Sequence, residues 1–201
     1  MTRVLVVYGS RHGGTQGIAE RIGEVLRARD LEAVVTTAEA VSESDIHAAD
    51  AFVIGSGVYM GSWLDEPLAF MANHADALAA RPLWLFSSGP LPGSSKDKGA
   101  VDPIENALGP ADGPGSGGRK KVEALSAATG PRDHRVFMGR YDPDDEAKNL
   151  PERFMKSFMR VIPAVRDVLP AGDYRDWVAI EAWAEGIASE LRRATIPVAT
   201  V

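Results

Sequence analysis

The segment from residue 6 to residue 22, VVYGSRHGGTQGIAERI, has the residue types and the spacing of an anion-binding loop. An apolar run, Val4–Tyr8, leads through small residues into a helical period that begins at Ile18. Free backbone N–H groups and the helix dipole at such a junction point at a bound anion. Hydroxyl groups and cationic side chains in the loop add to this attraction. The residues that we expect to bind a phosphate are Ser10, Arg11, His12, Gly13, Gly14 and Thr15.

A second glycine-rich segment, Gly55–Trp63 (GSGVYMGSW), has the composition of a loop that can approach a flat ring. Tyr59 and Trp63 offer aromatic faces for stacking, although such residues also pack on the protein itself. The segment Ser87–Pro92 would form the other wall, and it contains no aromatic residue, so one ring face would be open. The ring-binding candidates are Ser56, Gly57, Val58, Tyr59, Met60, Gly61, Trp63, Ser87, Ser88 and Gly89.

Alternating strands and helices must position these two segments. Short β-branched and aliphatic runs predict five strands: Arg3–Tyr8, Glu32–Thr37, Ala51–Ile54, Pro82–Phe86 and Arg135–Met138. Helical periods and start signals predict helices over Gly14–Arg29, Pro67–Ala79, Arg119–Ala128 and Asp176–Arg193. Apolar strands separated by helices are typical of a parallel sheet that is covered on both faces. The sequence therefore predicts an α/β fold in a single domain, residues 1–201.

The phosphate loop fits neither common nucleotide motif. A P-loop needs Lys and then Ser or Thr after its last glycine, whereas Thr15 and Gln16 follow Gly14. A dinucleotide fingerprint needs G-x-G-x-x-G spacing, which these glycines lack. The segment resembles the flavodoxin signature over its whole length. The matching residues are Val6, Val7, Tyr8, Ser10, Gly13, Thr15, Ala19 and Ile22.

The flavodoxin resemblance implies a three-layer α/β sandwich with a five-stranded parallel sheet of order 2-1-3-4-5. Ligands in this arrangement bind at the carboxyl ends of strands one and three, where the strand order reverses. The cofactor that the resemblance implies is FMN. Its phosphate would bind Ser10–Thr15, and its ring would lie between Ser56–Trp63 and Ser87–Gly89.

The second half of the chain contains more than a minimal flavodoxin, with insertions after strands four and five. The strand-three segment VIGSGVYMGSW, a Phe- and Met-rich segment after strand five and the closing DWVAIEAWAEGI together resemble menaquinone-dependent protoporphyrinogen oxidases. The chain departs from that branch at two places, since Tyr59 stands where the branch has Arg and His12 where it has Asp. The resemblance implies an FMN-dependent oxidoreductase.

The segment Leu150–Leu169 predicts an amphipathic helix that Pro163 kinks. Arg153, Lys156 and Arg160 recur at spacings of three and four, which gives its first half a basic face. We expect this helix to contact a substrate, a membrane surface or a second subunit. The alternative is that it covers an edge of the sheet.

Composition excludes several other functions. The chain of 201 residues is 45% hydrophobic and 25% charged, and its net charge of −6 argues against nucleic acid as a partner. The absence of cysteine excludes a thiol nucleophile and thiolate metal sites, and the four histidines lack metal-ligand spacing. No long apolar run and no leader pattern is present, so we expect a cytoplasmic protein.

Two functions remain after these exclusions. One is an enzyme that passes electrons between an organic donor and a quinone-type acceptor. The other is a one-electron carrier that docks a redox protein partner through an acidic face. A deazaflavin in the same cleft is a variant of both. Neither ring segment contains a carboxylate, so we expect no catalytic acid or base and favour direct hydride or electron transfer.

Overall fold

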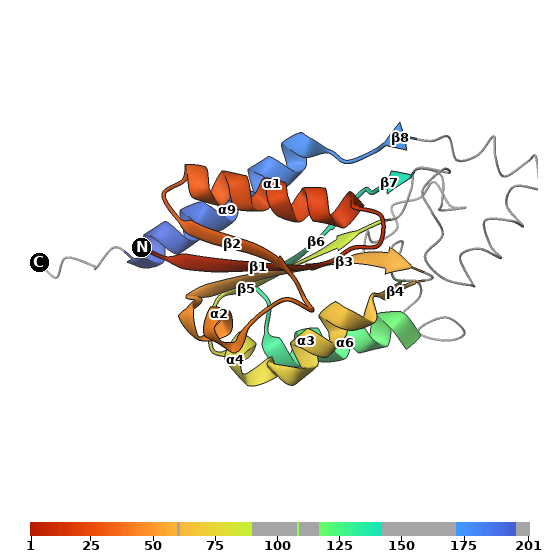
Figure 1. Cartoon of the computed structure of the whole chain (residues 1–201), viewed down its shortest axis with the longest axis horizontal. Coiled ribbons are helices and arrows are strands. Elements are labelled where there is room, and N and C mark those ends of the chain that lie inside the picture. Colours follow the sequence, from red (N-terminus) through yellow and green to blue (C-terminus); the bar gives the residue numbers. More distant parts are fainter. Residues whose placement is uncertain (60, 90–107, 109–116, 142–171, 196–201) are drawn as a thin grey trace, which may run out of the picture.

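The computed structural model describes residues 1–59, 61–89, 108, 117–141 and 172–195, and a parallel sheet lies at their centre (Figure 1). Its strands are β1 (Arg3–Gly9), β2 (Glu32–Thr37), β3 (Ala51–Tyr59), β5 (Leu83–Ser88) and β6 (Asp133–Phe137). They follow the order β2-β1-β3-β5-β6, and all four pairings are parallel. The expected order 2-1-3-4-5 is confirmed, with β5 and β6 as the fourth and fifth of the predicted strands.

Helices cover both faces of the sheet, which makes three layers (Figure 1). One face carries α1 (Gly14–Ala28) and α9 (Trp177–Thr195). The other face carries α2 (Glu43–Ala48), α3 (Asp65–Asn73), α4 (Ala75–Ala79) and α6 (Gly117–Thr129). The α1 helix forms against the sheet because its buried residues Ile18, Ile22 and Leu26 recur every four positions along one side.

The two layers of core follow from the alternation of side chains along the strands. Val4 and Val6 of β1 pack in the cluster beneath α1 and α9, whereas Leu5 and Val7 pack in the cluster beneath α3 and α6. Because both faces are covered, every residue from Val4 to Gly9 is buried. This double burial is why the predicted strands read as continuous apolar runs.

Several element boundaries differ from the sequence expectation. The segment Gly55–Tyr59 was expected to be a loop, but it continues β3, because its first residues pair with β1 and β5 and its last two pair with β4. The chain then turns back into β4 (Ser62–Trp63), which pairs antiparallel with the end of β3. The single helix expected over Pro67–Ala79 is two helices, α3 and α4, since the chain leaves helical geometry at His74.

Other elements were not expected at all. The α2 helix begins with a capping box, in which Ser42 and Asp45 each accept a hydrogen bond from the backbone N–H of the other. A small antiparallel ribbon is formed by β7 (Arg140–Tyr141) and β8 (Gly172–Asp173). The expected helix over Leu150–Leu169 lies outside the described residues. Within the described part of the chain, no helix combines the length and the apolar character that crossing a membrane requires.

Candidate functional site

The two predicted loops leave neighbouring strands at the same edge of the sheet. In the register of β1 and β3, Tyr8 lies opposite Gly55 and Gly9 lies opposite Ser56. The chain therefore leaves β1 for the phosphate loop beside the last residues of β3. On its other side β1 pairs with β2, so the strand order reverses between β1 and β3. Open α/β sheets bind their ligands at such a point.

The start of α1 leaves backbone donors for an anion. Its N-cap residue is Gly13, at φ 75°, and no side chain caps the helix. The first intrahelical bond runs from the Gly17 N–H to the Gly13 carbonyl at 3.0 Å. The preceding N–H groups, from Gly14 to Gln16, have no carbonyl within the helix to bond. Because the first turn also holds no acidic side chain, the dipole at this terminus favours a negative charge.

Gly57 on β3 allows two functional side chains to meet. A Cβ atom on Gly57 would lie 2.9 Å from Tyr59 Cε2 and 3.1 Å from Thr15 Oγ1. Only a residue without a side chain leaves room there for both the phenol ring and the threonine hydroxyl. Thr15 is itself buried, at 4% exposure, so its hydroxyl lies inside this corner of the site.

The Arg11 and His12 side chains of the phosphate loop lie against Tyr59. The guanidinium carbon of Arg11 is 5.0 Å from the centroid of the Tyr59 ring, which is cation–π distance. The His12 ring lies 6.2 Å from the same centroid and is tilted by 51°. The structure thus brings Arg11, His12, Thr15 and Tyr59 together, as a site shared by the two loops requires.

Trp63 lies elsewhere, in the core. Its side chain is 2% exposed, and its indole N–H donates a hydrogen bond of 2.8 Å to Ser87 Oγ. Ser87 Oγ is also 2.9 Å from His134 Nε2, and the His134 and Trp63 rings meet edge to face at 5.7 Å. Of the two aromatic residues predicted to stack on a ring, Tyr59 alone is at the loop surface.

Ser56 holds the first wall of the predicted ring site, and the end of β5 shapes the second. The Ser56 hydroxyl donates to the Gly57 carbonyl and accepts from the Leu64 N–H at 3.0 Å, so it fixes the hairpin from inside. Gly89, at φ 143°, donates from its N–H to the Phe137 carbonyl at 3.0 Å. A Cβ atom on Gly89 would be 3.4 Å from the Val58 Cβ, so the ends of β3 and β5 are in contact. Met60 lies outside the described residues.

The ribbon of β7 and β8 supports the phosphate loop, and sequence reasoning missed it. Arg175, just after β8, donates from Nη1 to the Gly14 carbonyl at 3.2 Å and pairs with Asp173 at 2.6 Å. Its guanidinium lies 4.4 Å above the Trp177 ring. Hydrogen bonds from Arg175 lower the pKa of Asp173, against the effect of burial. Such short strands, joined across a long stretch of chain, leave no periodic signal in the sequence.

A comparison with protein families decides what kind of domain this is. The model of the flavodoxin domain matches residues 5–157. The chain belongs to the flavodoxin domain family. Membership implies a flavin-binding redox domain, and the uncapped α1 terminus beside Thr15 and Tyr59 fits such a cofactor.

Solved structures with the same fold include two flavodoxins of similar size. A cysteine-to-serine mutant of flavodoxin from Pseudomonas aeruginosa matches at a TM-score of 0.53 and 17% identity, over 95% of this chain and 99% of that one. The flavodoxin, WrbA-like protein from Agrobacterium tumefaciens matches at a TM-score of 0.52 and 15% identity, over 96% of this chain and 99% of that one.

A larger protein contains the fold as a part. Rubredoxin oxygen:oxidoreductase from Desulfovibrio gigas matches at a TM-score of 0.56 and 16% identity, over 96% of this chain. This chain spans only 37% of the length of that protein. At these identities the likeness shows the fold. No curated protein matches the chain in sequence.

Proposed function

We propose that the flavin of this domain is FMN, bound noncovalently with its phosphate on residues Ser10–Thr15. The observation that carries the proposal is the uncapped start of α1, where backbone donors and the helix dipole face the loop. The Ser10 and Thr15 hydroxyls add donors for phosphate oxygens. Arg11 and His12 add side chains that carry or can acquire positive charge, which a phosphate requires and a bare ribityl chain does not.

The ring would lie between two walls. Tyr59 forms one of them, with its phenol packed over Gly57. Ser88 and Gly89, at the end of β5, form the other and present no aromatic ring, so a substrate could approach that face. Backbone groups near Gly57 would hydrogen-bond the ring edge. Buried Ser56, Trp63 and Ser87 hold these walls in place from below through their hydrogen bonds.

We propose that the protein passes electrons between an organic donor and a quinone-type acceptor. The isoalloxazine ring supplies the redox chemistry, and the protein supplies binding, orientation and charge. The described residues of the two ring segments include no carboxylate that could abstract a proton, which favours direct hydride or electron transfer. The Arg11 guanidinium over Tyr59 would stabilise negative charge that builds up nearby on reduction.

An electron carrier is the second candidate function. The net charge of −6 favours it, because an acidic surface attracts a basic redox partner protein. The layout of the chain also supports a place in the protoporphyrinogen oxidase branch. Tyr59 and His12 replace residues of that branch, so a porphyrinogen substrate rests on the layout of the chain alone. A deazaflavin with the same phosphate linkage would use the same loop.

A fluorescence titration with FMN, riboflavin and a phosphorylated deazaflavin tests the cofactor. We expect FMN to bind at least about 100-fold more tightly than riboflavin, because two or more charge-assisted hydrogen bonds to the phosphate are lost. Equal affinities for FMN and riboflavin would overturn the phosphate assignment. Tighter binding of the deazaflavin would show that the cofactor is the deazaflavin and not FMN.

A redox titration of the FMN-loaded protein then separates the two functions. One two-electron step indicates the enzyme, and two well-separated one-electron steps indicate the carrier. Oxidation of protoporphyrinogen coupled to reduction of a soluble menaquinone analogue tests the finer assignment. Turnover would place the chain in the oxidase branch, whereas a loaded protein that reduces the quinone only with other donors would exclude that substrate.

A further inference from the structure

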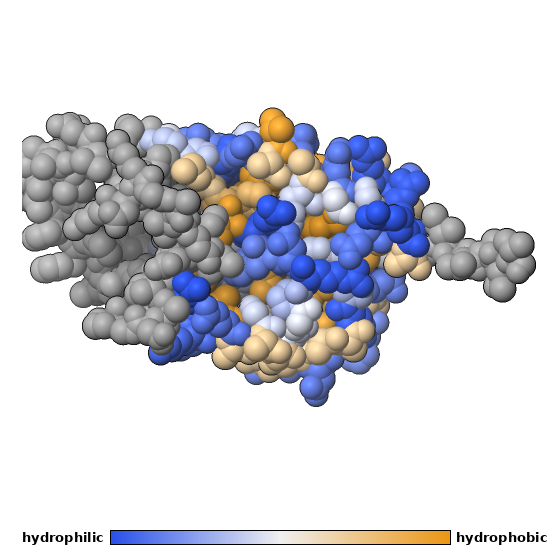
Figure 2. All heavy atoms as spheres, turned by 180° about the vertical axis from the view of Figure 1, so that it is seen from behind, coloured by the Kyte–Doolittle hydropathy of each residue, from blue (hydrophilic) through white to orange (hydrophobic). Residues whose placement is uncertain are grey.

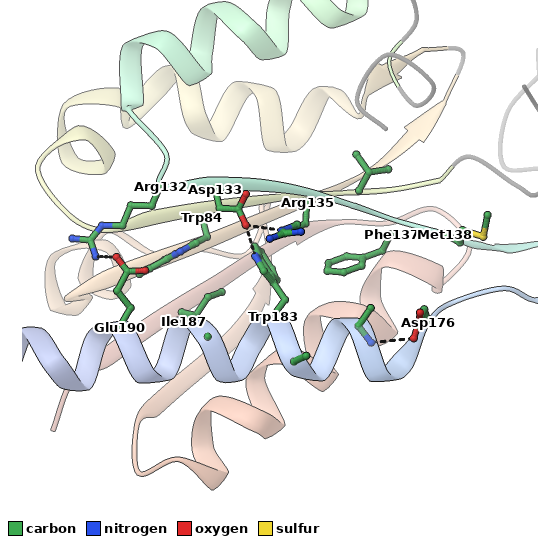
Figure 3. A pocket seen from close by; sticks show the side chains of 14 residues that line it. Trp84, Arg132, Asp133, Arg135, Phe137, Met138, Asp176, Trp183, Ile187 and Glu190 are labelled. Carbon is green, nitrogen blue, oxygen red and sulfur yellow. Dashed lines mark hydrogen bonds and ion pairs between the residues drawn. The ribbon is translucent and has the colours of Figure 1, made fainter. Parts of the chain in front are cut away.

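The sheet of the described residues has two outer edges, β6 at one end and β2 at the other. The β6 edge adjoins a groove of about 680 Å³ beside α9 (Figure 3). Figure 2 shows apolar surface between charged side chains on a face seen from this side of the molecule. The Asp133 carboxylate at this edge accepts from the His134 N–H and the Trp183 indole N–H. These groups are not available to a further strand, so such pairing is left to the β2 edge.

The outer side of β2 presents backbone groups. The N–H groups of Glu32 and Ala38 donate toward β1, which β2 has as its one neighbour among the described strands. Because backbone groups alternate in direction along a strand, those of Ala33, Val35 and Thr37 face outward. Within the described part of the chain, no group accepts a hydrogen bond from the outward N–H groups of these three residues. An edge of this kind can pair with another strand.

The β2 edge lacks the usual features that keep edge strands apart. Proline and charged side chains prevent unwanted pairing, and the run from Ala33 to Thr37 (AVVTT) contains neither. Its Val and Thr residues have high strand propensity. The Ala33 carbonyl accepts from Arg27 Nη1 at 2.8 Å and the Thr37 carbonyl from the Ala40 N–H at 3.1 Å. Each of these carbonyls keeps a second lone pair for a bond from another strand.

Helix α1 lies along this edge and runs in the opposite direction to β2. A Cβ atom on Gly23 would clash with Val35 Cγ2, so the middle of the helix is level with Val35. The Arg27 guanidinium, one turn further along the helix, contacts the Ala33 carbonyl. Arg27 therefore marks the level of Ala33 on the outer side of the sheet.

Glu20 marks the level of Thr37 at the other end of the strand. It precedes Gly23 by three residues and Arg27 by seven, so the three residues lie on one side of α1. The pKa of Tyr8, which pairs with Thr37 in the register of the strands, is raised by burial and further by the negative charge of Glu20. Both Glu20 and Arg27 are exposed.

Both of these charged side chains can accommodate another partner. Arg27 uses one of its guanidinium N–H donors on Ala33. Glu20 accepts from Gln16 Nε2 at 2.8 Å through Oε1, which leaves the lone pairs of its second oxygen. A guanidinium has several donors and a carboxylate has several acceptor positions, so these bonds do not prevent an ion pair.

A two-fold axis at Val35 matches the backbone and the charges together. In an antiparallel pair about this axis, Val35 lies opposite its own copy and Ala33 lies opposite Thr37 of the other copy. All three outward-facing residues then have hydrogen-bonding partners. The two α1 helices lie on the same face of the joined sheet, and the same axis places Arg27 of each copy opposite Glu20 of the other. Opposite charges that meet in this way fix the register of an interface.

We propose that β2 and the adjoining side of α1 form a two-fold interface between two copies of this chain, with reciprocal pairs of Arg27 and Glu20. The partner is a second copy because one patch carries both members of each pair, as a two-fold interface requires. The contact between the helices adds area that a pair of short strands lacks. The interface involves none of the ring segments, so the dimer forms with or without a flavin.

Two charge reversals test the interface. We expect the wild-type protein to sediment as a dimer at micromolar concentration. Glu20→Arg and Arg27→Glu each turn two attractive pairs into repulsive ones, which should raise the dimer dissociation constant about tenfold or more. Lys121→Glu makes the same change of charge as Arg27→Glu on an exposed residue of α6, on the opposite face of the sheet, and should leave the dimer intact.

Val35→Pro tests the backbone pairing. Proline at this position removes only an outward N–H, because the backbone groups of Val34 and Thr36 face β1, and edge strands tolerate such a proline. The variant should be a monomer whose circular dichroism matches that of the wild type. Thr36→Pro is the matched control, because it removes an N–H that faces β1 and should lower the stability of the fold itself.

Mixing the two charge variants tests the register. In a mixed pair each carboxylate again lies opposite an arginine, so equal amounts of Glu20→Arg and Arg27→Glu should recover the dimer. Circular dichroism checks that each variant is folded. A monomeric wild-type protein would overturn the proposal. A dimer that survives either reversal or the folded Val35→Pro variant, or a mixture that stays monomeric, would overturn it as well.

Discussion

The loop between β1 and α1 and the hairpin between β3 and β4 leave the same edge of the sheet, yet they use their polar groups in opposite ways. In the loop, α1 begins at Gly14 without a side-chain cap, and backbone donors remain for a ligand. In the hairpin, the Ser56 hydroxyl and the Trp63 indole N–H both have partners inside the protein. Both segments are rich in glycine and serine, so composition does not distinguish them.

The difference teaches that a binding segment is recognised by where its polar groups find partners. The hairpin is satisfied internally because β3 continues as a paired strand through Tyr59, and the Ser56 and Trp63 side chains are buried. The loop cannot be satisfied in that way, since the chain must leave β1 and start a helix. We therefore expect substitutions in the hairpin to change stability and substitutions in the loop to change ligand affinity.

The largest expected effect is the loss of stability in Trp63→Ala. Removing a large side chain that is 2% exposed should lower the free energy of unfolding by about 3–5 kcal/mol. Urea unfolding measures it. Trp63→Phe is the matched control, since it keeps a ring but removes the donor to Ser87, and should cost less. A variant of normal stability with recovered flavin fluorescence would instead make Trp63 the stacking residue.

The next effect is on affinity and concerns Thr15, whose hydroxyl lies in the corner of the site. Thr15→Ala should weaken FMN binding by about 1–3 kcal/mol, the range for a hydrogen bond to a charged group. Thr15→Ser, which keeps the hydroxyl, should bind nearly as the wild type does. Titration with riboflavin gives the internal control, because a ligand without phosphate should hardly respond to either change. An equal loss for both ligands would contradict a phosphate contact.

The sequence predicted the sheet well because its strands are buried on both faces. A short β-branched and aliphatic run such as Ala51–Ile54 is typical of a central parallel strand, and it is one here. The sequence did not predict that β3 reaches Tyr59, because Gly55 and Gly57 have low strand propensity and only pairing with the neighbouring strands β1, β5 and β4 overrides it. Gly55 is in fact demanded by the core, since a Cβ atom there would clash with the Phe86 ring.

The site was predictable where one local motif encodes it and not where distant segments meet. The phosphate loop lies within a single strand–loop–helix unit, so its spacing carries the signal. The roles of Tyr59 and Trp63 depend on which way the hairpin turns, and local sequence does not specify that. The α2 helix carried a readable signal, the capping box of Ser42 and Asp45. The contact of Arg175 with Gly14 carried none.

A smaller effect on affinity is expected for Tyr59, the residue at which the loop and the hairpin meet. Tyr59→Ala should weaken flavin binding by about 0.5–1.5 kcal/mol and should restore part of the quenched flavin fluorescence. Tyr59→Phe should keep both properties close to wild type, because the ring remains. Stability should change far less than in Trp63→Ala, because the Tyr59 ring is only partly buried. Unchanged fluorescence in the alanine variant would remove Tyr59 from the ring site.

The smallest expected effect concerns the support of the loop by Asp173 and Arg175. Hydrogen bonds from Arg175 lower the pKa of Asp173 in the folded protein below its ordinary value of 3.8. A lowered pKa means that the charged form stabilises the fold above about pH 4, and that this contribution is lost as the pH falls through the folded value. Asp173 is exposed, so solvent screens the pair and the contribution is at most about 1 kcal/mol.

Asp173→Asn isolates this contribution from the other carboxylates with lowered pKa values, Asp45 and Asp133. At pH 7 the variant should be slightly less stable than the wild type in urea, and the two stabilities should converge as the pH falls below 3.8, the ordinary pKa of Asp. Asp173→Asn should also lower the affinity for FMN, but by less than Thr15→Ala does. The reason is that Arg175 reaches the loop only through the Gly14 carbonyl. A stability difference that is the same at pH 3 and pH 7 would show that the Asp173 charge does not hold the loop. The difference between loop and hairpin would then depend only on the uncapped backbone N–H groups at the start of α1.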